Sequence, residues 1–236
     1  MNDPGLRPHR RAGAALAVRT LAVVVLLTGL FALAPAALAA SGEPATSARI
    51  VRTVAAAEAG APFPDVSADH PYAAAIAELA DKGVIGGYTD GLFRPEKPIW
   101  RQQFAKMLVL AMELPVSEDH VCQFLDVEVG GPDTFYPDNY VAVVHRWSIT
   151  FGITPEEFAP AREITRAQVV SLVARALNQL HSEVLDYPPS DFRSRWGQFD
   201  PDHAWAADLA EYNGLLAGFP QTGFDPWAPM PRAEVA

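Results

Sequence analysis

The chain of 236 residues contains a single cysteine, Cys122. One thiol cannot form an intramolecular disulfide, a Cys-x-x-Cys redox motif or a zinc site built from several thiolates, so these classes are excluded. Basic residues are also scarce, because 18 Lys and Arg stand against 28 Asp and Glu and none are pooled after the first twenty positions. We therefore expect no nucleic acid as a partner, since a basic face is absent.

Patterns for catalysis and for metal or cofactor binding are also missing. The histidines form neither an H-x-x-x-H pair nor an HExxH helix, no serine lies in a nucleophile elbow, and no glycine-rich loop can cradle a phosphate. Acidic pairs such as Glu156-Glu157 lie on predicted turns, where solvation explains them. We expect no enzyme, no metal and no small-molecule cofactor. Half of the residues are apolar, which is enough for one or two hydrophobic cores.

The first forty residues have the order of a secretory signal peptide. Arginines precede the apolar stretch 21–33, and Pro35 and a run of small residues follow it, which predicts cleavage after Ala39. The alternative is an uncleaved membrane anchor, because the run 20–40 is long enough to cross a bilayer. The proline and the weakly hydrophobic alanine tail favour cleavage, so we expect an exported protein.

Three imperfect copies of one unit follow. The segments 98–104, 163–169 and 229–235 each contain an arginine, with an apolar residue two positions before it and another three positions after it. In the first two copies apolar residues continue at i, i+3, i+4, i+7 and i+8, which predicts an amphipathic helix. The arginines recur at an almost constant interval along the chain, which we call the repeat interval: Arg101, Arg166 and Arg232.

Each copy also has an upstream helical stretch. In the first copy, His70-Pro71 is expected to begin this helix and Gly83 to end it. The third copy is matched to the first through His203, which predicts that both histidines act as helix caps. The second copy is matched more loosely, through an apolar stripe that ends with Trp147 before Gly152. Each copy is therefore predicted to be a helix, an irregular loop and a second helix, in a mainly α fold.

The copies are too small to bury their apolar faces alone, so the three are expected to pack together. The third copy stops two residues into the stripe of its second helix, which predicts an incomplete repeat and a fragmentary sequence. The expected domains are a signal peptide at 1–39, a linker at 40–61, and repeats at 62–115, 116–185 and 186–236, the last truncated.

The first copy resembles the S-layer homology domain family. That family's repeat opens with Phe-x-Asp-Val, continues with Gly-Tyr-x-Asp-Gly-x-Phe-x-Pro and ends with Ile-Thr-Arg-Ala-Glu. The first copy supplies the first two motifs at 63–66 and 87–95, and the second copy supplies the opening motif at 124–127. No copy has the complete last motif, since Trp100, for example, replaces its threonine. The resemblance extends over residues 62–236 through the shared register.

The resemblance implies three helix-loop-helix repeats in a pseudo-threefold bundle, with sugar-binding grooves between them. It implies non-covalent attachment to the cell envelope through an acidic, often pyruvylated, secondary cell-wall polysaccharide as the partner. The arginines of the last motif and the loop Asp-Gly are then ligand contacts. Trp100 joins them as an aromatic ring beside an arginine that can stack on a sugar. The expected ligand-binding residues are Arg101, Arg166, Arg232, Asp90, Gly91 and Trp100.

The residues themselves leave alternatives open. A cation in the first turn opposes the helix dipole, so helix formation gives no reason for three arginines there. Each arginine can bind an anionic ligand or pair with a neighbouring carboxylate. If they pair internally, the domain is a structural or protein-interaction module of the envelope. A glycan hydrolase would require a cleft with paired carboxylates.

Overall fold

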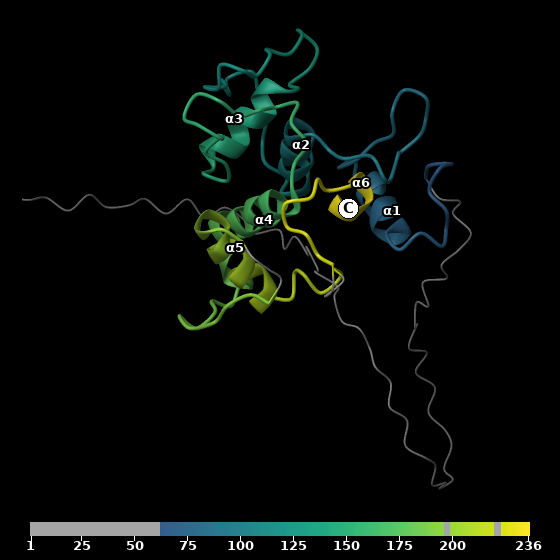
Figure 1. Ribbon diagram of the computed structural model, residues 1–236. Helices are drawn as coiled ribbons and strands as arrows, with labels where there is room; N and C mark the ends of the chain where they lie inside the picture. Colours follow the sequence, from purple (N-terminus) through teal and green to yellow (C-terminus); the bar gives the residue numbers. More distant parts are fainter. Residues whose placement is uncertain (1–61, 196–198, 220–222) are drawn as a thin grey trace, which may run out of the picture. The chain divides into compact units, whose positions relative to one another are not determined.

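The computed structural model describes residues 62–195, 199–219 and 223–236, so the expected signal peptide and linker lie outside the described residues. The described part is mainly helical and contains isolated backbone bridges instead of strands, which confirms the mainly α fold. None of its helices is both long and apolar enough to pass through a membrane. In order, the elements are α1 (Ala73–Asp81), α2 (Arg101–Ala111), α3 (Asp138–Arg146), α4 (Arg166–Leu180), η1 (Ser182–Val184), α5 (Pro201–Tyr212) and α6 (Arg232–Val235) (Figure 1).

Three extended segments meet in the core and join in a closed ring of backbone hydrogen bonds. The amide of Ile99 donates to the carbonyl of Met230 at 3.1 Å, Ile164 donates to Ile99 at 2.9 Å, and Met230 donates to Ile164 at 2.9 Å. All three side chains are at most 2% exposed. Each segment therefore donates to one neighbour and accepts from the other, as a pseudo-threefold arrangement of three units would require.

The same cyclic order continues into the helices. The first amides of an α-helix have no partner within the helix and must find one elsewhere. Here they donate to backbone carbonyls of another copy. The bonds from the three arginine amides are Arg101 to Arg162 at 3.0 Å, Arg166 to Ala228 at 3.2 Å and Arg232 to Lys97 at 3.0 Å. Each arginine is thus placed against the loop of a different copy from its own.

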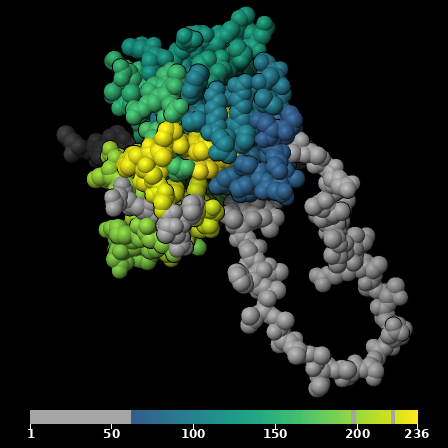
Figure 2. All heavy atoms as spheres, turned by 45° about the vertical axis from the view of Figure 1, so that its right-hand side comes forward, coloured from purple at the N-terminus to yellow at the C-terminus, as the bar shows by residue number. Residues whose placement is uncertain are grey.

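Helix packing follows this order as well. Helix α2 packs on α3 and α4 packs on α5, so the second helix of one copy contacts the first helix of the next. Tyr72, which precedes α1, lies near the charge of Glu234 on α6. Figure 1 draws α6 beside α1, and in Figure 2 the yellow C-terminal segment lies directly against the blue first copy. The last helix therefore returns to the first.

The ends of the first helices correct the register expected from sequence. Gly83, Ser148 and Gly214 follow α1, α3 and α5 and have positive φ values of 70°, 57° and 73°. They recur at the same repeat interval as the arginines. Ser148 is therefore the residue that follows the first helix of the second copy, and Gly152 lies in the next loop. Trp147, the end of the predicted apolar stripe, lies at the C-cap position of α3 and is 39% exposed.

The predicted role of His203 as a cap is also wrong. Asp200 caps α5, because its carboxylate accepts hydrogen bonds from the amides of Asp202 and His203. In the structural register His203 corresponds to Tyr72, two residues after His70. Matching by residue type chose the wrong offset, because the two histidines look equivalent when the helix ends are unknown. His70 accepts a hydrogen bond from the Tyr72 amide, at the start of α1.

The closed ring predicts that its side chains carry much of the stability. We expect Ile164→Ala to lower the free energy of unfolding by about 2–5 kcal/mol, because a fully buried side chain leaves a cavity at the junction of three segments. Ile153→Ala is the matched control, since that side chain is 46% exposed, and should cost at most about 0.5–1 kcal/mol. Urea denaturation measures both, and equal losses would contradict a stabilising junction.

Candidate functional site

The loop between the two helices has the same path in the first and second copies. The Tyr88 amide donates to the Leu92 carbonyl at 2.8 Å, and the Ile153 amide donates to the Glu157 carbonyl at 2.7 Å. These two bonds are separated by the repeat interval. The Gly-Tyr-x-Asp-Gly motif occurs only in the first copy, so residue types matched only the end of the second loop, at 158–160, and not its opening turn. The two loops therefore share a backbone path although their residue types differ.

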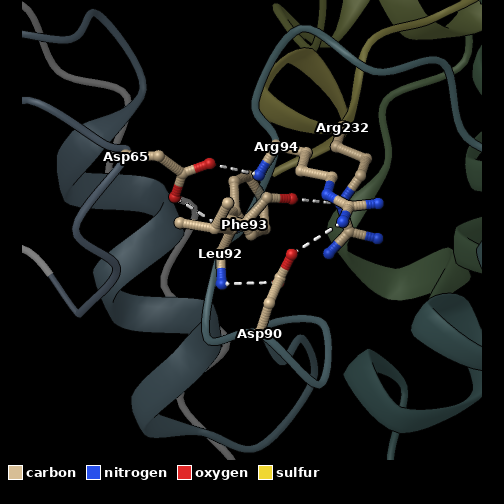
Figure 3. Close-up of polar contacts among 6 residues, drawn as sticks. All are labelled: Asp65, Asp90, Leu92, Phe93, Arg94 and Arg232. Carbon is tan, nitrogen blue, oxygen red and sulfur yellow. Dashed lines mark hydrogen bonds and ion pairs between the residues drawn. The ribbon is translucent and has the colours of Figure 1, made fainter.

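An aspartate holds each of these two loops. The Asp65 carboxylate accepts hydrogen bonds from the amides of Phe93 at 2.8 Å and Arg94 at 2.7 Å (Figure 3). Asp126 does the same for Phe158 at 2.8 Å and its neighbour at 2.7 Å. Burial acts to raise the pKa of Asp65, but the two amide donors outweigh it and lower the pKa below its ordinary value. The aspartate of Phe-x-Asp-Val therefore positions the loop. We call the two hydrogen bonds that Asp65 accepts the Asp65 clamp.

Two of the three arginines reach the loop held in this way. Arg232 donates from Nε to the Phe93 carbonyl at 2.8 Å (Figure 3). It also donates from Nη2 to the Gly86 carbonyl at 3.0 Å. Arg101 donates from Nε to the Phe158 carbonyl at 2.7 Å. Each guanidinium also lies over the phenylalanine ring, at 4.6 and 4.7 Å from its centre. Both arginines are buried, at 8% and 4% exposure.

Each of these arginines lines its own hollow. We call the hollow of Arg232 groove 1 and the hollow of Arg101 groove 2. Groove 1 has a volume of about 400 Å³ and is lined by 83–87, Gln103, Lys106, Met107, Leu110, Tyr136 and Arg232. Groove 2 has a volume of about 470 Å³ and is lined by Arg101, 150–153, Gln168, Ser171, Leu172, Arg175, Asp202 and His203. The lining positions on α2 match those on α4 one by one at the repeat interval, so the grooves are equivalent sites with different side chains.

The buried guanidiniums of the two grooves lack carboxylate partners. Among the described residues neither Arg101 nor Arg232 forms an ion pair, and the Arg101 Nη atoms have no hydrogen-bond acceptor there. Burial, followed by the charge of Arg162, lowers the pKa of Arg101 to about 10. Burial also lowers the pKa of Arg232. Both remain cations at neutral pH. The nearby charges of Asp126 and Asp65 favour the two cations but form no ion pair with them, and an anionic ligand would supply the missing partner.

Arg166 differs from the other two. Its guanidinium forms a two-pronged ion pair with Glu234, from Nε to Oε2 at 2.7 Å and from Nη2 to Oε1 at 2.6 Å. Hydrogen bonding to this carboxylate raises the pKa of Arg166. Glu234 stands at the position that is glutamine in the other copies, Gln103 and Gln168. Internal ion pairing, one of the two alternatives from sequence, therefore describes Arg166 in this structure.

The other expected contacts lie elsewhere. Asp90 accepts hydrogen bonds from the Leu92 amide and from Arg94 Nη2, which together lower its pKa. Neither Asp90 nor Gly91 is among the residues lining groove 1 or groove 2. Trp100 is 38% exposed and lines a separate hollow with Asp126 and Glu128.

Sequence comparison also missed side chains that do line the grooves: Lys106, Arg175 and His203. The repeat interval equates Lys106 with Ser171 and Leu110 with Arg175, so it relates the lining positions of the two helices but does not single out their basic side chains. His203 comes from the first helix of the third copy, and only folding brings it there. Within the described residues, no three His, Cys, Asp or Glu side chains gather closely enough to hold a metal ion.

The fold and the site together define a class of protein. It is a domain built from helix-loop-helix copies, with buried arginines that line grooves. Residues 62–105 match the S-layer homology domain. The chain is 32% identical to S-layer protein EA1 of Bacillus anthracis over 64% of this chain and 17% of that protein. It is 31% identical to S-layer protein sap of the same organism over 80% and 22%, and 30% identical to a cellulosome-anchoring protein of Acetivibrio thermocellus over 53% and 28%. The chain therefore spans less than a third of the length of these relatives.

These matches confirm the resemblance found in the sequence. Residues 62–105 are an S-layer homology domain segment, and they contain the Asp65 clamp, the loop 87–95 and the start of α2.

The loop geometry predicts that alanine is tolerated less well at one of two glycines with nearly equal φ. Gly152 has a φ of 81°, and a Cβ there would come within 3.0 Å of the carbonyls of Thr154 and Glu157, whereas a Cβ at Gly91, with a φ of 79°, meets nothing within 4 Å. Backbone strain is equal, so the clash should make Gly152→Ala less stable than Gly91→Ala by about 1–3 kcal/mol. Thermal unfolding measures both, and equal melting temperatures would contradict the described loop.

The Asp65 clamp predicts a pH-dependent stability. At pH 7 we expect Asp65→Asn to lower the free energy of unfolding by about 1–3 kcal/mol, since one of the two amides loses its acceptor. The folded-state pKa lies below the ordinary value of 3.8, so the stabilisation is present above that value and is lost as pH falls through the folded pKa. Denaturation from pH 6 to pH 2 should show wild type and variant converging in acid. A constant difference would contradict the role of the ionised carboxylate.

Proposed function

We propose that this chain is a non-enzymatic anchoring module of the cell surface that binds an acidic secondary cell-wall polysaccharide non-covalently. The similarity to S-layer and cellulosome-anchoring proteins supports cell-wall anchoring as the general role. The finer assignment, an acidic and pyruvylated glycan as the ligand, is our proposal. It fits an exported protein, as the signal peptide expected at residues 1–39 would provide.

The observation that carries the proposal is the pair of buried arginines without carboxylate partners, Arg101 and Arg232, each opening on an equivalent groove. A guanidinium presents donors in a planar fork that matches a carboxylate. A further cation stands in each groove, Lys106 in groove 1 and Arg175 in groove 2. A sugar acid or a pyruvate ketal offers the single carboxylate that such a pair of cations would hold.

The negative net charge of −10 does not oppose binding of an acidic glycan. Remote surface charges are screened within about 8 Å at physiological salt, so the local cations of a groove dominate. Each charged hydrogen bond to a ligand contributes about 1.5–3 kcal/mol. Loss of one such contact therefore weakens a groove by about tenfold or more.

Arg166 is not assigned to a binding groove in this proposal. It would contact a ligand only after giving up Glu234, so we assign binding to the grooves of Arg101 and Arg232. Asp90, Gly91 and Trp100 stay as predicted contacts for parts of a longer glycan that extend beyond the grooves. The second candidate function, a protein-interaction module, is favoured by one observation, the internal ion pair of Arg166.

The test is a pull-down of the full chain on purified cell-wall sacculi, before and after mild acid removes the non-peptidoglycan polymer. Binding should disappear on stripping. The double variant Lys106→Gln with Arg175→Gln places one change in each groove, and neither side chain holds a backbone carbonyl. We expect it to weaken binding by about tenfold or more, whereas Arg146→Gln, an exposed arginine outside both grooves, should bind as wild type does.

Two outcomes would contradict the proposal. Binding that survives stripping would indicate peptidoglycan or protein contacts. Wild-type binding by the folded double variant would remove both grooves as the sites. Arg101→Gln is a second probe of groove 2, with its melting temperature measured first, because its Nε atom also bonds to Phe158.

A further inference from the structure

Groove 2 contains a histidine, His203, and groove 1 has no histidine among its lining residues. Three elements supply the basic groups of groove 2: α2 gives Arg101, α4 gives Arg175 and α5 gives His203. In groove 1 the equivalent of Arg175 is Leu110, and its basic residues are Arg232 and Lys106. Groove 1 therefore holds an arginine and a lysine, whereas groove 2 also holds a histidine, the side chain whose ordinary pKa lies nearest to physiological pH.

The imidazole of His203 is held in a defined orientation. Its Nδ1 atom lies 2.6 Å from Ser171 Oγ on α4, a buried hydroxyl that can donate to or accept from this nitrogen. The ring also meets Trp227 edge to face, with centres 5.6 Å apart. Among the described residues Nε2 has no hydrogen-bond partner. The serine therefore fixes the ring, and the second nitrogen is left for a ligand.

The charges around His203 come from every element packed against it. Asp200 and Asp202 of its own helix raise its pKa, while Arg175 on α4 and Arg101 on α2 lower it. Ser171 and Trp227 are uncharged. Burial has the largest effect, and the net result is a pKa below 6.5. The free protein thus holds a mostly neutral imidazole beside two cations at neutral pH.

We propose that His203 is a ligand-binding residue of groove 2, where its imidazolium joins Arg101 and Arg175 in holding an anionic group of the glycan. The inference rests on the proposed function of this groove. A bound anion supplies the opposite charge that favours the protonated ring. Binding is then accompanied by proton uptake at His203, with no covalent step.

The direction of the pH effect follows from linkage. The pKa of His203 is higher with the anion bound than in the free protein, so the bound state takes up a proton between these two values. Affinity of groove 2 therefore rises as pH falls through the bound-state pKa and levels off below the free-state pKa. Groove 1 has no histidine among its lining residues, and its affinity should not change in this range through the protein.

The experiment measures retention of the full chain on unstripped sacculi at pH 7.5 and pH 5.0, in the Lys106→Gln background that weakens groove 1. A pKa that rises by one on binding corresponds to a tenfold change in affinity, so we expect about threefold to tenfold tighter binding at pH 5.0. His203→Gln should remove this difference between the two pH values. His181→Gln is the matched control, a histidine outside the groove residues that pairs with Glu183, and should behave as its parent does.

His203→Lys is a second variant, which supplies a permanent cation. It should bind at pH 7.5 about as well as its parent binds at pH 5.0. Binding by His203→Gln that keeps the parent's pH dependence would overturn the role of His203 and leave the proposed function standing. Absence of binding to sacculi by wild type at both pH values would overturn the proposed function, and this inference with it.

Discussion

The ring of backbone hydrogen bonds that joins Ile99, Ile164 and Met230 is the constraint on which the rest of the structure depends. Its three residues precede three helices, and each helix starts two residues after its ring position. Once the ring is closed, the first turn of every one of these helices is fixed against a different copy. The side chains are buried, so the polar ring is formed in an apolar environment, where an unpaired amide or carbonyl is costly.

This cyclic geometry explains why the candidate sites are shared between copies. An arginine at the first turn of one copy lies on the loop of the next, and the aspartate of that next copy orients the loop that receives it. Clamp, loop and arginine therefore act together although they are far apart in sequence. Arg166 fits the same frame but finds a glutamate, Glu234, in place of a glutamine. Glu234 on α6 thus pairs with the half-buried guanidinium of Arg166, whereas the glutamines at the equivalent positions line the grooves of Arg101 and Arg232.

Much of the fold could be predicted because it depends on local patterns. The helical stripes after Arg101 and Arg166, the turn at Gly83 and the nearly constant repeat interval are readable from residue types, and the first copy contains motifs specific enough for the S-layer homology domain. The register of the upstream helices was misjudged, since histidines and aromatic residues recur by chance, whereas a positive φ at Ser148 leaves no mark in the sequence. The opening turn of the second copy's loop, closed by the bond from the Ile153 amide to the Glu157 carbonyl, was not matched because its residue types differ from those of the first copy.

The sequence by itself determined the helical class, the three arginines and their position at helix starts, because periodicity, helix ends and spacing are properties of a short stretch of chain. Only the tertiary structure decided which arginines are paired, that Lys106 and Arg175 stand at the grooves, and that His203 meets Ser171. These are contacts between copies, and the chain reaches them only when the ring is closed. The environment of a charge depends on what packing brings beside it, and so the chemistry of each groove is set after folding.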